Sequence, residues 1–195
     1  MYGVAAVPLP DGRVLLASAG KDCTVRLLDP AAGTAVGDPL EGHTRPVNGV
    51  AAVPLPDGRV LLASAGADFS AHPSADHPFR NTIRLWDPAT GTQAGDPLQG
   101  DTNRVNAVAP VPLPDGRVLL ASASADETVR LWDPAIGTAV GDPLEGHTAP
   151  VSAVAPVPLP DGRMLLASAS YDNTVRLWIP SLGPLSASYA SLAPV

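Results

Sequence analysis

The chain has 195 residues, of which 45% are hydrophobic but only 4% aromatic, so alanine, valine and leucine must supply most of its apolar surface. Its net charge of −7 offers no basic surface for nucleic acid or an anionic membrane. The single cysteine, Cys23, cannot form an internal disulfide. No apolar run approaches the ~18 residues of a membrane span, and the N-terminus lacks the pattern of a signal peptide. We therefore expect a cytoplasmic protein.

Proline and glycine recur at fixed places, which indicates turns rather than disorder. The string PDG begins at Pro10, Pro56, Pro114 and Pro160, at intervals of 46, 58 and 46 residues. The longer interval contains twelve additional residues, FSAHPSADHPFR, at 69–80. The chain is therefore one unit written four times with a single insertion. Within one domain, the predicted units are residues 1–46, 47–104, 105–150 and 151–195.

The third copy shows the elements of one unit in chain order. VNAVAPV is a short apolar run, and LPDG has the residues of a type I turn. VLLASAS follows as a second strand, and TVRLWD alternates so that Val129 and Leu131 share one face. TAVGDPLEG is a weaker edge strand, because Pro143 is unsuited to the centre of a sheet. Each unit is thus predicted to be a four-stranded antiparallel sheet, covered on both faces by its neighbours.

The pattern GHT, PDGR, LLASAS, D.TVRLWD resembles the repeats of the WD40 (WD-repeat) β-propeller family, over about residues 3–179. The composition is similar to that of bacterial members. The resemblance implies an all-β fold of radial four-stranded blades and a role as a docking platform for proteins. Four blades in this chain would form an open arc or half-ring.

The resemblance also implies a structural hydrogen-bond network in each blade, made of a histidine, a serine, an aspartate and a tryptophan. The matching residues are His43, Ser64, Asp68 and Trp86; Ser122, Asp126 and Trp132; and His147, Ser168, Asp172 and Trp178. The third blade has Asp101 in place of the histidine, and the first has Ser18 and Asp22 but no histidine, with Leu28 in place of tryptophan.

A histidine, a serine and an aspartate also suggest a hydrolase. The set recurs once per blade beside a tryptophan, however, and the chain has no GxSxG motif. The innermost strands carry no carboxylates. We therefore expect a non-catalytic protein without a cofactor.

The two ends of the chain depart from the pattern. The chain begins within an innermost strand, at Gly3–Val7, and the repeat is lost after Trp178, where Leu185–Leu192 could form an outer strand. An arc of four blades would leave two apolar faces uncovered. The chain could be a fragment of a longer propeller, half of a ring of two chains, or a tight four-bladed ring; we favour the first two.

The insertion has three interpretations. A metal site formed by His72, Asp76 and His77 is disfavoured, because their spacing matches no established ligand pattern. A solvated segment without fixed structure fits its serine, alanine and proline content. We favour a recognition loop bracketed by two aromatic residues, which the resemblance places on the same face as the GH loops. Its candidate partner-binding residues are Phe69, His72, His77, Phe79 and Arg80.

Other candidates for partner binding lie on the same face, at positions where the residue type differs between the four repeats although the surrounding sequence is conserved among them. They are Lys21, Arg45, Asn103, Arg104 and Tyr171. Arginine and tyrosine are enriched in interface hot spots. The sequence thus predicts a scaffold that binds another protein through the rim of the propeller. The alternative is an architectural protein that self-assembles through its open blade faces.

Overall fold

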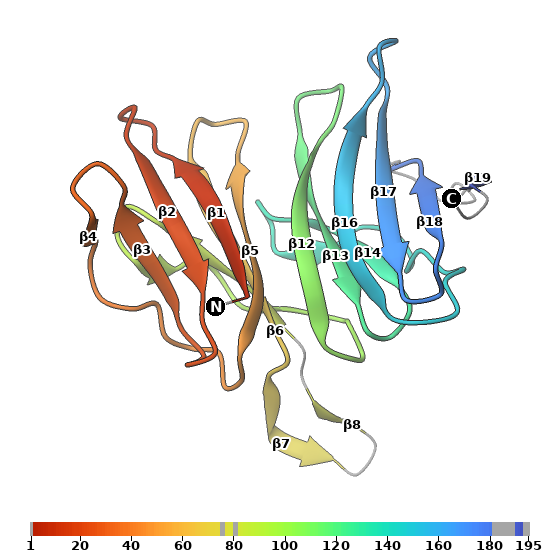
Figure 1. Ribbon diagram of the computed structural model, residues 1–195, viewed down its shortest axis with the longest axis horizontal. Coiled ribbons are helices and arrows are strands. Elements are labelled where there is room, and N and C mark those ends of the chain that lie inside the picture. The colour runs from red at the N-terminus through yellow and green to blue at the C-terminus, as the bar shows by residue number, and fades with distance from the viewer. Residues whose placement is uncertain (1, 75–76, 80–81, 181–189, 193–195) are drawn as a thin grey trace.

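The computed structural model describes residues 2–74, 77–79, 82–180 and 190–192, with the backbone alone described for 69–74, 77–79 and 190–192. Strands and turns make up this part of the chain (Figure 1). Among the described residues, no helix has the length and apolarity needed to cross a membrane.

Four antiparallel sheets follow one another along the chain, and we call them blades 1 to 4. Blade 1 contains β1 (Gly3–Pro8), β2 (Val14–Ala19), β3 (Val25–Asp29) and β4 (Thr34–Ala35). Blade 2 contains β5 (Val47–Pro54), β6 (Val60–Gly66), β9 (Thr82–Asp87) and, both paired with β9, β10 (Thr92–Gln93) and β11 (Leu98–Gln99). Blade 3 contains β12 (Val105–Pro112), β13 (Val118–Ser124), β14 (Val129–Asp133) and β15 (Thr138–Ala139). Blade 4 contains β16 (Val151–Pro158), β17 (Met164–Ser170), β18 (Val175–Trp178) and β19 (Ala190–Leu192). The predicted all-β fold of four-stranded blades is confirmed.

The PDG turn that joins the first two strands of a blade has the predicted geometry. In blade 1, the amide of Gly12 donates to the carbonyl of Leu9 at 3.0 Å, which closes a four-residue turn around Pro10 and Asp11. Gly12 has a φ of 87°, a value that L side chains adopt only with strain. The carboxylate of Asp11 accepts hydrogen bonds from the backbone amide and the side chain of Arg13. The turn therefore depends on local chemistry and recurs in every blade.

The blades pack face to face, and each junction holds its own apolar cluster. Between blades 2 and 3, Leu61 and Leu85 lie in one cluster with Leu120 and Trp132, and all four are buried. Clusters of leucine, valine and alanine, each with one tryptophan, fill the other two junctions. The many alanines allow close approach of the sheets, because small side chains need little space between layers. Both faces of blades 2 and 3 are thereby covered.

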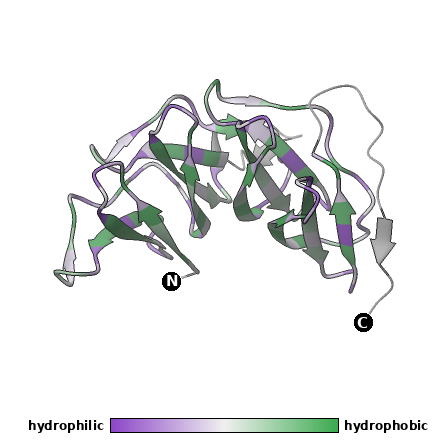
Figure 2. Cartoon of the chain, turned by 90° about the horizontal axis from the view of Figure 1, so that it is seen from above, coloured by the Kyte–Doolittle hydropathy of each residue, from purple (hydrophilic) through white to green (hydrophobic). Residues whose placement is uncertain are grey.

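The blades follow an open arc with blades 1 and 4 at its ends (Figure 2). The innermost strands lie in the order β1, β5, β12, β16, and the first and last of them are not neighbours. The structure therefore has the predicted open arc rather than a tight four-bladed ring.

Because strands alternate in direction, the connections fall on two opposite edges of the arc. We call one the turn edge; it carries residues 9–13, 55–59, 113–117 and 159–163 together with 29–33, 87–91 and 133–137. We call the other the loop edge; it carries residues 20–24, 67–74, 77–79, 125–128 and 171–174 together with 41–46, 100–104 and 146–150. Within the described part of the chain, the predicted network and partner-binding residues belong to the loop edge or to the strands that lead to it.

The outer strand of blade 4, β19, comes from the C-terminal part of the sequence. β19 pairs with β18, and Leu192 lies opposite Val175. In the other blades, leucines at 40, 98 and 144 lie opposite the equivalent residues of the third strand. The end of the chain therefore supplies the outer strand, although its sequence departs from the repeat. Each blade is built from one continuous stretch of chain.

Candidate functional site

In blade 2, the predicted network surrounds a buried histidine. His43 Nδ1 lies 2.7 Å from a carboxylate oxygen of Asp68, and its Nε2 lies 2.7 Å from the hydroxyl of Ser64. The indole of Trp86 donates to the same hydroxyl at 2.8 Å. Asp68 also accepts hydrogen bonds from the backbone amide of Thr44 and the hydroxyl of Thr82. The network thus connects the loop that precedes β5 with β6, with the segment that follows β6, and with β9.

Blade 4 repeats this arrangement. His147 Nδ1 lies 2.7 Å from Asp172, its Nε2 lies 2.8 Å from the hydroxyl of Ser168, and Trp178 donates to that hydroxyl at 2.8 Å. His147, Ser168 and Trp178 are buried. The structure therefore brings together the same four residue types in both blades.

The aspartates of these networks are held in the ionised form. Burial acts to raise the pKa of Asp68, but hydrogen bonds and the charge interaction with His43 outweigh it, so the pKa lies below its usual value. For Asp172, burial is likewise outweighed, by hydrogen bonds from Thr174 and His147 among others, and the pKa is lowered. Each carboxylate therefore stays charged and accepts hydrogen bonds from the neighbouring loop, including the backbone amide of Thr44 in blade 2 and of Thr148 in blade 4.

Blade 3 replaces the histidine with a buried carboxyl group, that of Asp101. The hydroxyl of Ser122 donates to it at 3.2 Å, and Trp132 donates to Ser122 at 3.0 Å. Asp126 instead receives hydrogen bonds from Thr128 and from the backbone amide of Thr102. Burial, together with the negative charge of Asp126, raises the pKa of Asp101 to about 7.

We predict that this carboxyl group makes the protein less stable as pH rises. The folded chain holds the proton of Asp101 up to about pH 7, whereas the ordinary value is 3.8, so stability falls as pH rises through this window. Asp101→Asn should match the wild type near pH 4 and exceed it at pH 8 by about 2–4 kcal/mol. Urea unfolding at both pH values measures the difference. The exposed Asp142→Asn is the matched control, and an equal pH dependence of wild type and Asp101→Asn would contradict the prediction.

Blade 1 lacks the network. Asp22 accepts hydrogen bonds from Thr24 in its own turn and, at 3.0 Å, from Arg26 in β3. Leu28 occupies the register position of the tryptophans, opposite Leu16. Ser18 is buried but has no histidine beside it. In blade 1, β2 and β3 are therefore joined here by strand pairing and packing, without the side-chain network of blades 2 and 4.

The geometry of the serines favours a structural role. Ser64 and Ser168 are buried, and their hydroxyls already contact both a histidine and a tryptophan. A nucleophile must reach its substrate, and these hydroxyls do not reach the surface. The network can therefore order the loop edge, but it offers no exposed group for acyl transfer.

The varied residues of the loop edge lie around this buried framework. Lys21, Arg45, Asn103, Arg104 and Tyr171 are all exposed. Asn103 accepts a hydrogen bond from the backbone amide of Arg104, whose guanidinium donates to Asn106 at 2.9 Å. These contacts hold the Arg104 side chain in place beside the innermost strand of blade 3. The exposed residues are distributed over all four blades.

The insertion forms a separate two-stranded antiparallel hairpin of β7 (Phe69–Ser74) and β8 (His77–Phe79). It projects from the loop edge of blade 2 (Figure 1). Phe69 lies opposite Phe79 in the pairing. The side chains of Phe69, His72, His77 and Phe79, and all of Asp76 and Arg80, lie outside the described part, so their partner-binding and metal-binding roles are untested.

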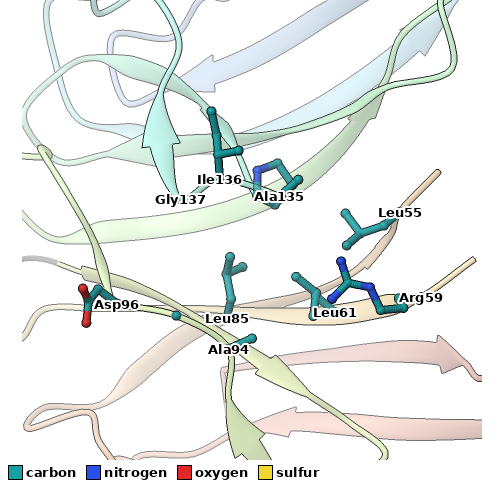
Figure 3. A pocket seen from close by; sticks show the side chains of 11 residues that line it. Leu55, Arg59, Leu61, Leu85, Ala94, Asp96, Ala135, Ile136 and Gly137 are labelled. Carbon is teal, nitrogen blue, oxygen red and sulfur yellow. The ribbon is translucent and has the colours of Figure 1, made fainter. Parts of the chain in front are cut away.

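Sequence reasoning missed a groove on the turn edge between blades 2 and 3 (Figure 3). The cavity has a volume of about 450 Å³, and its walls come from both blades. Among its lining residues are Leu61, Leu85, Ala94, Asp96 and Ile136. Two departures from the repeat could have indicated it: Ala94 stands where blades 1 and 3 have valine, and Ile136 stands where blades 1 and 2 have Ala and Thr.

The model of the family described as WD domain, G-beta repeat matches residues 35–72, 94–133 and 139–178, which is more than half of the chain. The first match ends within the insertion, where the chain departs from the repeat. No curated protein matches the chain. WD40 repeats in general serve as scaffolds for protein interactions and are not catalytic. With these matches and its four-stranded blades, the chain belongs to the WD40 repeat family.

Proposed function

We propose that this protein is a non-catalytic scaffold in the cytoplasm that binds a partner protein through the loop edge. The observation that carries the proposal is the contrast between two sets of residues on this edge. The network residues recur in full in blades 2 and 4 and in part in blade 3, and they are mostly buried and hydrogen-bonded to one another, whereas Lys21, Arg45, Asn103, Arg104 and Tyr171 vary and are exposed. A constant framework that presents different side chains is typical of a recognition surface.

The framework also holds neighbouring blades in fixed positions. The side-chain amide of Asn48 donates to the carbonyl of Val105 in the next blade at 2.9 Å, and Asn106 donates to Val151 at 2.7 Å. These bonds run between innermost strands close to the loop edge. A surface ordered before binding loses less conformational entropy on association. The hairpin extends this surface, and we include Phe69, His72, His77, Phe79 and Arg80 in it.

A protein partner fits the charge better than nucleic acid or a membrane. The net charge is −7, and many of the eleven arginines are paired with aspartates of their own blade. Phosphate backbones and anionic lipids require clusters of free basic residues. Arg45 and Arg104 with Tyr171 are instead the types that anchor protein interfaces.

Site-specific photo-crosslinking in the producing cell tests this proposal. A photoreactive amino acid at the exposed position of Asn103 should give a defined cross-linked product, whereas the same group at exposed Ala31, on the turn edge, should not. The product should be lost when Arg104→Ala and Tyr171→Ala are combined. Equal products from both positions, or a product that survives the double substitution, would refute the loop-edge proposal.

A second candidate function is self-assembly, favoured by the apolar ends of the arc. On the free face of blade 4, Val175 is 43% exposed, whereas the equivalent Val129 in blade 3 is fully buried against blade 4. On the free face of blade 1, Val4 is 64% exposed, whereas the equivalent Val50 in blade 2 is 9% exposed. Terminal units of repeat proteins usually carry a polar outer face. In the described part of the chain, both ends of this arc instead expose valine side chains.

We propose a second copy of the chain as the cover for these faces. The free face of blade 4 has the residues with which blades 2 and 3 contact the next blade, and the free face of blade 1 largely repeats those that contact the preceding blade. Blade 4 of one copy can therefore pack on blade 1 of the other as adjacent blades do within the chain. Two copies contain eight blades, which is within the usual range of about 4–8 for closed propellers.

A further inference from the structure

The groove between blades 2 and 3 is distinct from both surfaces above. It opens on the turn edge, opposite the loop edge, and lies at an internal junction rather than at an end of the arc. Leu55, Leu61 and Leu85 of blade 2 form one wall, and the turn of blade 3 that contains Ile136 forms the other (Figure 3). The three leucines are buried parts of the junction core. The groove therefore extends the apolar core of the junction out to the surface.

One residue, Ala94, makes this junction unlike the other two, and a second, Ile136, makes it unlike the junction between blades 1 and 2. Ala94 partly lines the groove, and the equivalent Val36 and Val140 carry two additional methyl groups at the same place. Ile136 is 71% exposed, although it is a large aliphatic residue in a turn where blade 2 has Thr90. The first difference enlarges the recess and the second adds an apolar contact at its mouth. Both changes favour binding of an apolar side chain.

The charges at the groove favour a ligand in which a basic residue stands next to the apolar side chain. Asp96 lies at one end of the groove and is exposed (Figure 3). Arg59 lies at the other end, where Asp57 pairs with its Nε at 2.7 Å. The arginine charge is thus balanced by its own turn, whereas the Asp96 carboxylate has no counterion of this kind among the described residues. The net charge of −7 acts in the same direction.

We propose that the groove binds an extended segment of a partner protein in which an aliphatic side chain is flanked by lysine or arginine. The aliphatic side chain enters the space beside Ala94 and contacts Leu85 and Ile136. The basic side chain lies against Asp96. The proposal does not depend on the loop edge, because the two surfaces share no residue.

Selection from a displayed library of random short peptides, with the purified chain as target, tests this inference. The enriched peptides should share an aliphatic residue beside lysine or arginine. The selected peptides should bind Ala94→Val roughly tenfold more weakly or worse, because the valine of the other blades fills the recess. Asp96→Asn should weaken binding and reduce its dependence on salt, and Ile136→Thr, which installs the residue of blade 2, should also weaken it.

The controls separate this proposal from the other surfaces. Ala94→Val and Ile136→Thr install residues that the repeat itself uses, and circular dichroism should show unchanged folding. Arg104→Ala on the loop edge should leave peptide binding unchanged, so a failure of the loop-edge proposal does not affect this result. The inference is overturned if no peptides are enriched, if the enriched peptides are acidic, or if they bind Ala94→Val as tightly as the wild type.

Discussion

Replacing Trp132 with alanine should lower the free energy of unfolding by about 3–5 kcal/mol. The side chain is 1% exposed and lies in the cluster between blades 2 and 3, so its loss leaves a cavity at a junction. The indole also donates to Ser122 at 3.0 Å, and that hydroxyl would lose a buried partner. Urea unfolding followed by far-UV circular dichroism, at one fixed protein concentration, measures the loss.

Two variants calibrate this result. Trp132→Leu should lower the free energy of unfolding less than Trp132→Ala does, because blade 1 has the same fold with Leu28 at this position. Ile136→Ala, in the same blade but 71% exposed, should change stability by about 0.5 kcal/mol or less. If Trp132→Ala and Ile136→Ala unfold at the same urea concentration, the tryptophan is not the structural anchor that its burial indicates.

The repeat predicted the blades because each turn and strand depends on local sequence. Pro10, Asp11 and Gly12 determine their turn without help from distant residues, and TVRLWD alternates as its burial requires. The exposed ends of the arc also followed from the sequence, because an arc of four two-sided sheets leaves two faces free. The sequence pattern of each turn and strand, together with the number of repeats, was sufficient to predict these features.

Features that depend on distant segments could not be derived in the same way. The hairpin of β7 and β8 forms although Pro73 and Pro78 weaken the strand pattern, because both strands of an isolated two-stranded sheet are edge strands, where proline is tolerated. The groove combines Ala94 with Ile136, which belong to different blades, so neither residue alone indicates it. The raised pKa of Asp101 likewise arises from burial together with Asp126, a residue distant in sequence.

A glutamate on either end face should abolish pairing of two copies. Val175→Glu alters the free face of blade 4, and Val4→Glu alters that of blade 1. Both sites are exposed in the single chain, where a carboxylate is hydrated, but at a closed junction the charge would be buried without a partner at a cost of several kcal/mol. Each junction of a closed pair joins blade 4 of one copy to blade 1 of the other, so each variant alone should be monomeric.

Mixing the two variants tests the direction of pairing. A mixed pair has one junction that carries both glutamates and one that carries neither, so Val175→Glu and Val4→Glu together should regain association through a single junction. Val14→Thr, a neutral change at a 45% exposed position of the blade 1 face, is the control for loss of apolar surface alone. Variants that stay monomeric when mixed would argue against head-to-tail pairing.

The most direct test is the molar mass of the wild-type chain, measured by light scattering after size-exclusion chromatography over a range of concentrations. If a second copy covers the apolar ends of the arc, the mass should be twice that of the 19.8 kDa chain. A mass of 19.8 kDa at all concentrations would contradict pairing and show that the end faces remain stable in water without a cover.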